Sequence, residues 1–138
     1  MKTYQPKLKD IKRRWILIDM KGQILGRVAT QIAGLLMGKT KENYVPHLDM
    51  GDYVVIINAK EVVVTGEKSK QKVYRGHSGY PGGLKEVSYK KLTKEQPLKV
   101  IEHAVSGMLP DNKLKSERMR RLKIFSDDKH PYSDKIAK

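Results

Sequence analysis

The chain has 138 residues, with 29 Lys and Arg against 15 Asp and Glu, which gives a formal net charge of +14 at neutral pH. This length is close to that of one typical domain, and the clustering of its aliphatic residues argues against full disorder. The absence of cysteine excludes disulfides, thiolate metal sites and cysteine nucleophiles. No apolar stretch has the length of a signal-peptide core or a spanning helix, so we expect a soluble intracellular protein.

The first segment of the chain predicts a strand followed by a helix. The aromatic and aliphatic run 15–18 is typical of a buried strand. Residues 25–37 carry apolar side chains at helical spacing along one face, and Gly38 predicts the end of that helix. Gly26 and Gly34 lie inside it, where each glycine costs about 1 kcal/mol relative to alanine. We expect that these glycines are present because the helix packs closely against another part of the chain there.

The middle of the chain predicts more strands. The continuous apolar run 53–57 is typical of a strand that is covered on both faces. Together with the preceding strand and helix, it implies a parallel pair with a right-handed crossover. Shorter strands are predicted at 62–65 and 72–74, on either side of a basic turn at 66–70, and they form a hairpin or an edge.

The last segment predicts three helices and a strand. A short helix is expected at 89–94, and Pro97 opens a second helix that ends before Pro110. Its predicted inner face consists of Ile101, Ala104, Val105 and Met108. Asp111 or Asn112 caps a third, short helix that runs through Leu114, Arg118 and Met119, and a final strand includes Leu122, Ile124 and Phe125. Alternating strands and helices favour a three-layer α/β domain over an all-β barrel.

The charge divides the chain into parts. Basic residues outnumber acidic ones six to one in 1–14, eight to two in 66–94 and six to one in 113–125, whereas the stretches between them are nearly neutral. We therefore expect a basic N-terminal arm at 1–14, a single α/β domain at 15–125 and a polar surface tail at 126–138. Concentrated Lys and Arg favour nucleic acid as the partner over an anionic membrane or mere solubility, because phosphate contacts release condensed counterions.

Two enzyme-like patterns are weaker alternatives. The segment 34–40 resembles a phosphate-binding loop, but only three residues separate its glycines and it lies at the end of a helix rather than the start. His47 and Asp49 suggest a metal or acid-base cluster, but two side chains do not complete a ligand set. Bracing of the turn into the next strand is the better role for Asp49 and Asp52. A phosphate-handling enzyme would use Lys39 and Thr40 with His47 and Asp49.

Two basic segments are better explained by binding. In 72–85, glycines allow close approach of backbone amides to an anion, Arg75 and Lys85 supply charge, and Tyr74, His77 and Tyr80 can stack on bases or sugars. The segment 113–123 carries cations on several helical faces with a single acid, which suggests a helix against phosphates. No helix-turn-helix or zinc module is recognisable, which weighs against a sequence-specific DNA binder.

Four motifs in order resemble the bacterial type of the ribosomal protein L13 (uL13) family, over about residues 1–132. They are Trp15–Asp19 followed by Leu25-Gly26-Arg27-Val28-Ala29, the block 44–53 with Asn58-Ala59, the glycine-rich stretch 77–85, and Gly107–Pro110 with Leu122–Phe125. The resemblance implies a three-layer α/β/α domain with a small, mostly parallel sheet. It also implies a structural constituent of the large ribosomal subunit, without catalytic activity or cofactor.

The resemblance further implies the partners and the location. The expected partners are large-subunit rRNA of the 23S type and neighbouring large-subunit ribosomal proteins, with a role in early subunit assembly and translation and no membrane or small-molecule substrate. The expected location is the cytoplasmic ribosome, with an organellar ribosome as the alternative.

The expected RNA-binding residues lie in the basic islands, the glycine-rich stretch and the family motifs. They are Arg13, Arg14, Arg27, Lys39, Lys41, His47, Lys68, Lys70, Lys72, Arg75, His77, Ser78, Gly79, Tyr80, Gly82, Gly83, Lys85, Arg118, Arg120, Arg121 and Lys123.

Overall fold

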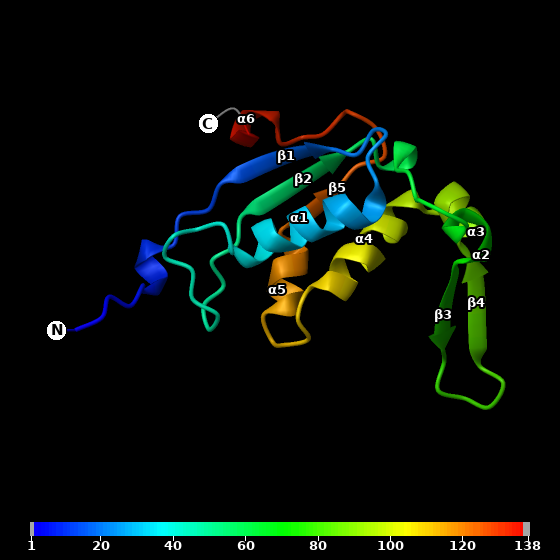
Figure 1. Ribbon diagram of the computed structural model, residues 1–138, viewed down its shortest axis with the longest axis horizontal. Coiled ribbons are helices and arrows are strands. Elements are labelled where there is room, and N and C mark those ends of the chain that lie inside the picture. The colour runs from blue at the N-terminus through cyan, green and yellow to red at the C-terminus, as the bar shows by residue number, and fades with distance from the viewer. Residues whose placement is uncertain (1, 137–138) are drawn as a thin grey trace.

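A computed structural model describes residues 2–136; residues 1, 137 and 138 of the expected arm and tail lie outside this range. Figure 1 shows a parallel sheet covered by helices, with a separate hairpin that projects from the body. The elements are β1 (Trp15–Asp19), α1 (Leu25–Met37), β2 (Tyr53–Ile57), α2 (Lys68–Gln71), β3 (Val73–His77), β4 (Leu84–Ser88), α3 (Tyr89–Glu95), α4 (Pro97–Met108), α5 (Lys115–Arg120), β5 (Leu122–Ile124) and α6 (Ser133–Ile136), with short 3₁₀ turns at Leu8–Asp10 and Ala59–Glu61.

The main sheet has the order β1-β2-β5, and both pairings are parallel. Trp15 of β1 pairs with Tyr53 of β2, and Val54 of β2 pairs with Leu122 of β5. The central position of β2 explains its continuous apolar sequence, because strands buried on both faces do not alternate. The predicted parallel pair, the α/β class and the final strand are confirmed.

Helix α1 connects β1 to β2 and has the predicted bounds. Its apolar stripe, which includes Val28, Ile32 and Leu36, is buried against the sheet. The helix ends at Gly38 with a φ of 80°, and a Cβ there would lie 2.7 Å from the carbonyl oxygen of Met50. Glycine is therefore required at this stop for both its conformation and its size.

The expected close packing at Gly26 and Gly34 is wrong. A Cβ built at either position meets no atom within 4 Å, so no neighbour in the described protein demands a glycine there. Packing within the described chain therefore does not explain why glycine occupies these two positions of α1.

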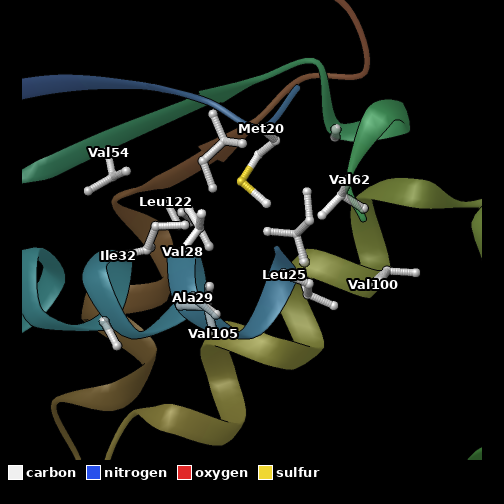
Figure 2. Close-up of a cluster of buried hydrophobic side chains, with 14 of the residues drawn as sticks. Met20, Leu25, Val28, Ala29, Ile32, Val54, Val62, Val100, Val105 and Leu122 are labelled. Carbon is white, nitrogen blue, oxygen red and sulfur yellow. The ribbon is translucent and has the colours of Figure 1, made fainter. Parts of the chain in front are cut away.

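The core lies between the sheet and the helices α1 and α4. Figure 2 shows Met20, Val54 and Leu122 directed toward Val28 and Ile32 of α1. Burial of aliphatic side chains such as these, at roughly 25 cal/mol per Å² of apolar surface, is the main stabilising contribution.

The buried face of α4 differs in part from the prediction. Ile101 and Val105 are buried as expected, but Val100 is also fully buried, and Met108 is 41% exposed. Helix α4 packs against α3 as well as α1, so its buried face is wider and rotated relative to the predicted stripe. Met108 lies on the last turn, beyond this cover.

The opposite face of the sheet is covered by the C-terminal segment. The rings of Trp15 and Tyr53 stack with centroids 4.3 Å apart, and Tyr132 stacks on Trp15 at 5.0 Å. Lys135 places its Nζ 4.8 Å from the centroid of the Trp15 ring. Figure 1 shows α6 lying along β1, so the tail packs on the sheet as a thin third layer and is more than a polar surface segment.

The predicted strand at 62–65 is wrong. Only Val63 pairs, in an isolated parallel bridge with Ile24 beyond the end of β1. The predicted strand at 72–74 is instead the start of β3, which pairs with the unpredicted β4, and the predicted basic turn contains α2. The side chains of β3 and β4 are mostly exposed, so no apolar pattern marked this hairpin in the sequence.

A cluster of arginines around Asp49 joins distant segments. Arg121 forms a two-pronged ion pair with the Asp49 carboxylate and also donates from Nη2 to the carbonyl oxygen of Leu36 at 2.9 Å. Arg13 donates to the carbonyl oxygens of Gly51 and Asp49 at 2.6 and 2.9 Å. Arg118 lies 3.8 Å from the same carboxylate through its Nε atom.

Asp52 makes a second link in the same loop. Its Oδ1 accepts a hydrogen bond from the backbone N–H of Arg14 at 2.9 Å and pairs with Nζ of Lys41 at 2.7 Å. The predicted bracing role of Asp49 and Asp52 is confirmed. Together, these carboxylates connect the arm, the loop before β2 and the start of β5.

We predict that Asp49→Ala lowers the free energy of unfolding by about 3 to 5 kcal/mol, because it leaves the buried guanidinium of Arg121 unpaired. Glu117→Ala is the matched control, since Glu117 pairs with Arg120 on the exposed face of α5 and its loss should cost less than about 1 kcal/mol. Denaturant unfolding of both variants gives the comparison. Equal losses for the two variants would contradict this role of Asp49.

Candidate nucleic-acid interface

The β3–β4 hairpin projects away from the sheet and helices (Figure 1). Its strands run antiparallel from the Val73–Ser88 pair to the His77–Leu84 pair. At the base, the N–H of Tyr89 donates to the carbonyl oxygen of Lys72 at 2.8 Å. The hairpin therefore presents both faces to solvent while its base remains attached to α3.

The base of the hairpin is also fixed by Tyr74. Its ring packs against His103 of α4, with centroids 5.4 Å apart. Burial, with a smaller effect from Tyr89, raises the pKa of the Tyr74 phenol, so it stays protonated at neutral pH. Tyr74 is thus an anchor for the hairpin, which leaves less of its ring available for the stacking role that its sequence position suggested.

The glycines of the hairpin tip form its turn. Gly79 and Gly82 have φ values of 84° and 72°, and a Cβ at Gly83 would lie 2.8 Å from the carbonyl oxygen of Tyr80. The N–H of Gly83 donates to Tyr80 O at 2.9 Å, and that of Ser78 donates to Gly83 O at 3.1 Å. These residues determine the shape of the tip.

The tip presents an exposed aromatic ring. Tyr80 is 76% exposed, and Leu84 beside the turn is also exposed. His77 is exposed as well, and its Nδ1 accepts the N–H of Gly79 at 2.9 Å, which holds the imidazole at the tip. The sequence analysis identified Tyr80 and His77 as candidate RNA contacts but not Leu84. The only sequence signal for Leu84 is that it is an apolar residue within a basic, glycine-rich stretch.

The cations near the hairpin differ in their partners. Lys70 lies 3.6 Å from Glu67, and Arg75 pairs with Glu86 across the hairpin at 2.8 Å. Within residues 2–136, no carboxylate oxygen lies within 4.0 Å of Nζ of Lys68, Lys72 or Lys85. These three exposed lysines have no internal neutralisation and are open to an external anion.

Other expected cations lie on the surface at separate places. Arg27 is exposed near the start of α1, and Lys39 follows the end of that helix. His47 is exposed in the loop before β2, and Arg14 is exposed at the end of the arm. All four side chains remain accessible, and Arg27 lines the same hollow as Lys68 and Lys72 near the base of the hairpin.

Four of the expected RNA-binding cations, two of them buried, contact other groups of the same chain. Arg118 is 1% exposed and Arg121 is 6% exposed, and both lie in the Asp49 cluster with Arg13. Lys41 pairs with Asp52 and donates to the carbonyl oxygen of Lys12 at 2.6 Å. Their positive charges are used to hold loops and termini together.

The remaining cations of the 113–123 segment are more accessible. Arg120 is exposed and pairs with Glu117 at 2.8 Å, whereas Lys123 is partly buried on β5. The predicted helix with cations directed outward on several faces does not form, because Arg118 of α5 and Arg121, which follows its end, turn inward.

The enzyme-like patterns have no catalytic geometry. Gly38, Lys39 and Thr40 follow the C-terminal end of α1, where carbonyl groups rather than amides are available, and the Asp49 carboxylate is occupied by arginines. Across residues 2–136, no three side chains of the His, Asp or Glu type come together as metal ligands. In the same range, no helix combines the length and apolar character needed to cross a bilayer.

The family model described as ribosomal protein L13 matches residues 13–131 of the chain. A large ribosomal subunit protein uL13 from Thermoanaerobacter sp. (strain X514) is 50% identical over 132 residues, which cover 96% of this chain and 92% of the relative. Proteins of the same name from Clostridioides difficile (strain 630) and Pseudomonas entomophila (strain L48) are each 50% identical over 133 residues, and cover 96% of this chain and 93% and 94% of those relatives.

Proposed function

The chain belongs to the ribosomal protein L13 family, and from this premise we propose that it binds large-subunit rRNA through its exposed basic surface and supports early assembly of the subunit. Members of this family are structural components of the large ribosomal subunit and not enzymes. The chain accordingly belongs to the ribosome of the cytoplasm, where rRNA and neighbouring ribosomal proteins are its proposed partners.

The observation that carries the RNA proposal is the set of three exposed lysines that have no carboxylate partner among residues 2–136, Lys68, Lys72 and Lys85. They lie in and beside a hairpin that projects from the body, so an RNA backbone can approach without displacing core elements. Neutralisation of phosphates by such side chains releases counterions and supplies affinity that does not depend on sequence.

The proposed contacts divide by role. Exposed cations would bind phosphates, Tyr80 and His77 would stack on bases or sugars, and the glycines of the tip would keep the turn in shape. The proposed RNA-contacting residues are Arg14, Arg27, Lys39, His47, Lys68, Lys70, Lys72, Arg75, His77, Ser78, Tyr80, Lys85, Arg120 and Lys123, with Gly79, Gly82 and Gly83 shaping the tip and Arg13, Lys41, Arg118 and Arg121 supporting the fold.

We predict that combined replacement of Lys68, Lys72 and Lys85 by Gln weakens binding to transcribed large-subunit rRNA. The plot of log affinity against log salt concentration should become shallower by about 2 to 3, because each lost phosphate contact removes about 0.7 to 0.9. Filter binding at several salt concentrations measures this slope.

The matched control replaces Lys90, Lys94 and Lys99 by Gln. These lysines are also exposed, and the control changes the net charge by the same amount. It should leave the slope nearly unchanged. An equal effect of both triple variants would mean that net charge alone attracts the RNA, and would contradict a defined surface.

We predict that Tyr80→Ala lowers rRNA affinity by about 1 to 3 kcal/mol, because the exposed ring offers a stacking face for one base. Its thermal unfolding should not change, since the ring contributes little to the core. Tyr80→Phe retains the ring and should bind as the original chain does. If Tyr80→Ala binds rRNA with full affinity, the tip does not stack on a base.

A further inference from the structure

A hollow of about 570 Å³ lies between the start of α1, the segment before α2 and the last turns of α4. Its volume is within the range of pockets that hold small ligands, roughly 300 to 1,000 Å³. It is lined by Ile24, Leu25, Gly26, Arg27, Val64, Thr65, Lys68, Lys72, His103, Ala104, Gly107 and Met108.

The lining combines an apolar surface with cations. Leu25, Val64 and Met108 supply aliphatic surface, and Met108 is among the few large apolar side chains left exposed. Arg27, Lys68 and Lys72 supply positive charge, and no carboxylate belongs to the described lining. The hollow is complementary to a ligand that has both an apolar part and negative charge.

Two glycines face this hollow from different helices. Gly26 belongs to α1 and Gly107 to α4, and a Cβ at either position would meet no atom within 4 Å. Gly26 is the second residue of α1 and Gly107 the last but one of α4, and no described neighbour requires glycine at either position. The absence of side chains at these two positions leaves the hollow open.

An aromatic ring completes the lining. His103 borders the hollow and is held by its contact with Tyr74, whose ring centroid lies 5.4 Å away. Histidine is among the side chains on which unstacked RNA bases rest. The position of Lys72, with Nζ 5.3 Å from the centroid of the Tyr74 ring, places a cation beside this aromatic pair.

We propose that the hollow receives one unstacked nucleotide of RNA, with its base on the apolar and His103 surfaces and its phosphate on Arg27, Lys68 and Lys72. This inference rests on the proposed rRNA binding and adds a single-nucleotide site to it. Lys68 and Lys72, in and after α2 at the base of the hairpin, line one side of the hollow, and the start of α1 lines another. The concave shape and apolar lining of the hollow would favour binding of an unstacked base over binding of the backbone of an RNA helix.

The test is Gly26→Leu, which places a side chain in the hollow. Gly34→Leu is the matched control, because it lies in the same helix, has equally open space at its Cβ and does not line the hollow. Gly26 lies in the first turn of α1 and Gly34 in its interior, and a Cβ at either position meets open space, so neither change should lower the melting temperature. If Gly26→Leu does not fold, Gly107→Leu fills the hollow from α4 and replaces it.

The measurements are affinity for transcribed large-subunit rRNA and the reactivity of its bases toward a base-modifying reagent in the complex. We expect Gly26→Leu to bind at least about fivefold more weakly than Gly34→Leu, as loss of one stacked base implies. One base or a few that the original chain and Gly34→Leu protect should become reactive.

Equal affinity and equal base protection for the two variants would overturn the nucleotide site while leaving rRNA binding intact. Failure of the original chain to bind rRNA would instead overturn the proposed function on which it rests. If Gly26→Leu binds naked rRNA normally but is not incorporated into large subunits, a segment of a neighbouring protein fills the hollow, and the nucleotide proposal is wrong.

Discussion

The ion pair between Asp49 and Arg121 is the interaction on which the arrangement of this molecule depends. Arg121 precedes β5, and its guanidinium bonds both to the carboxylate of Asp49 and to the carbonyl oxygen of Leu36 near the end of α1. Arg13 bonds to the same loop from the arm. This cluster thereby holds a helix end, a loop, a strand start and the N-terminal arm together, and removal of the Asp49 carboxylate leaves the buried Arg118 and Arg121 without a carboxylate partner within residues 2–136.

This use of charge changes the meaning of the net charge of +14. Four cations form ion pairs with Asp49 or Asp52: Arg13, Lys41, Arg118 and Arg121. Several surface cations pair with neighbouring acids. Near the hairpin, Lys68, Lys72 and Lys85 have no carboxylate partner within residues 2–136 and are the cations most open to an external polyanion. The proposed RNA surface is therefore narrower than the count of basic residues suggests, and it coincides with exposed aromatic and apolar side chains.

The sequence predicted α1 and the central strand β2 well, and it predicted the exposed hairpin only in part, through the start of β3. Residues 25–37 and 53–57 were identifiable because burial imposes a regular apolar pattern on a helix or a central strand. Strand β4 had no such pattern, since its stability comes from backbone pairing with β3 in solvent. The inward turn of Arg118 and Arg121 could not be read from their own segment, because their partner Asp49 lies in a loop far along the chain.

The central claim is that lysines beside the hairpin meet rRNA while others serve the fold, and acylation of lysines followed by mass spectrometry tests it directly. In the free chain, Lys68, Lys72 and Lys85 should react and Lys41 should react poorly, because Lys41 is paired with Asp52 and partly buried. In purified large ribosomal subunits, the first three should become protected. Equal reactivity of Lys68, Lys72 and Lys85 in the free chain and in the subunit would contradict the account.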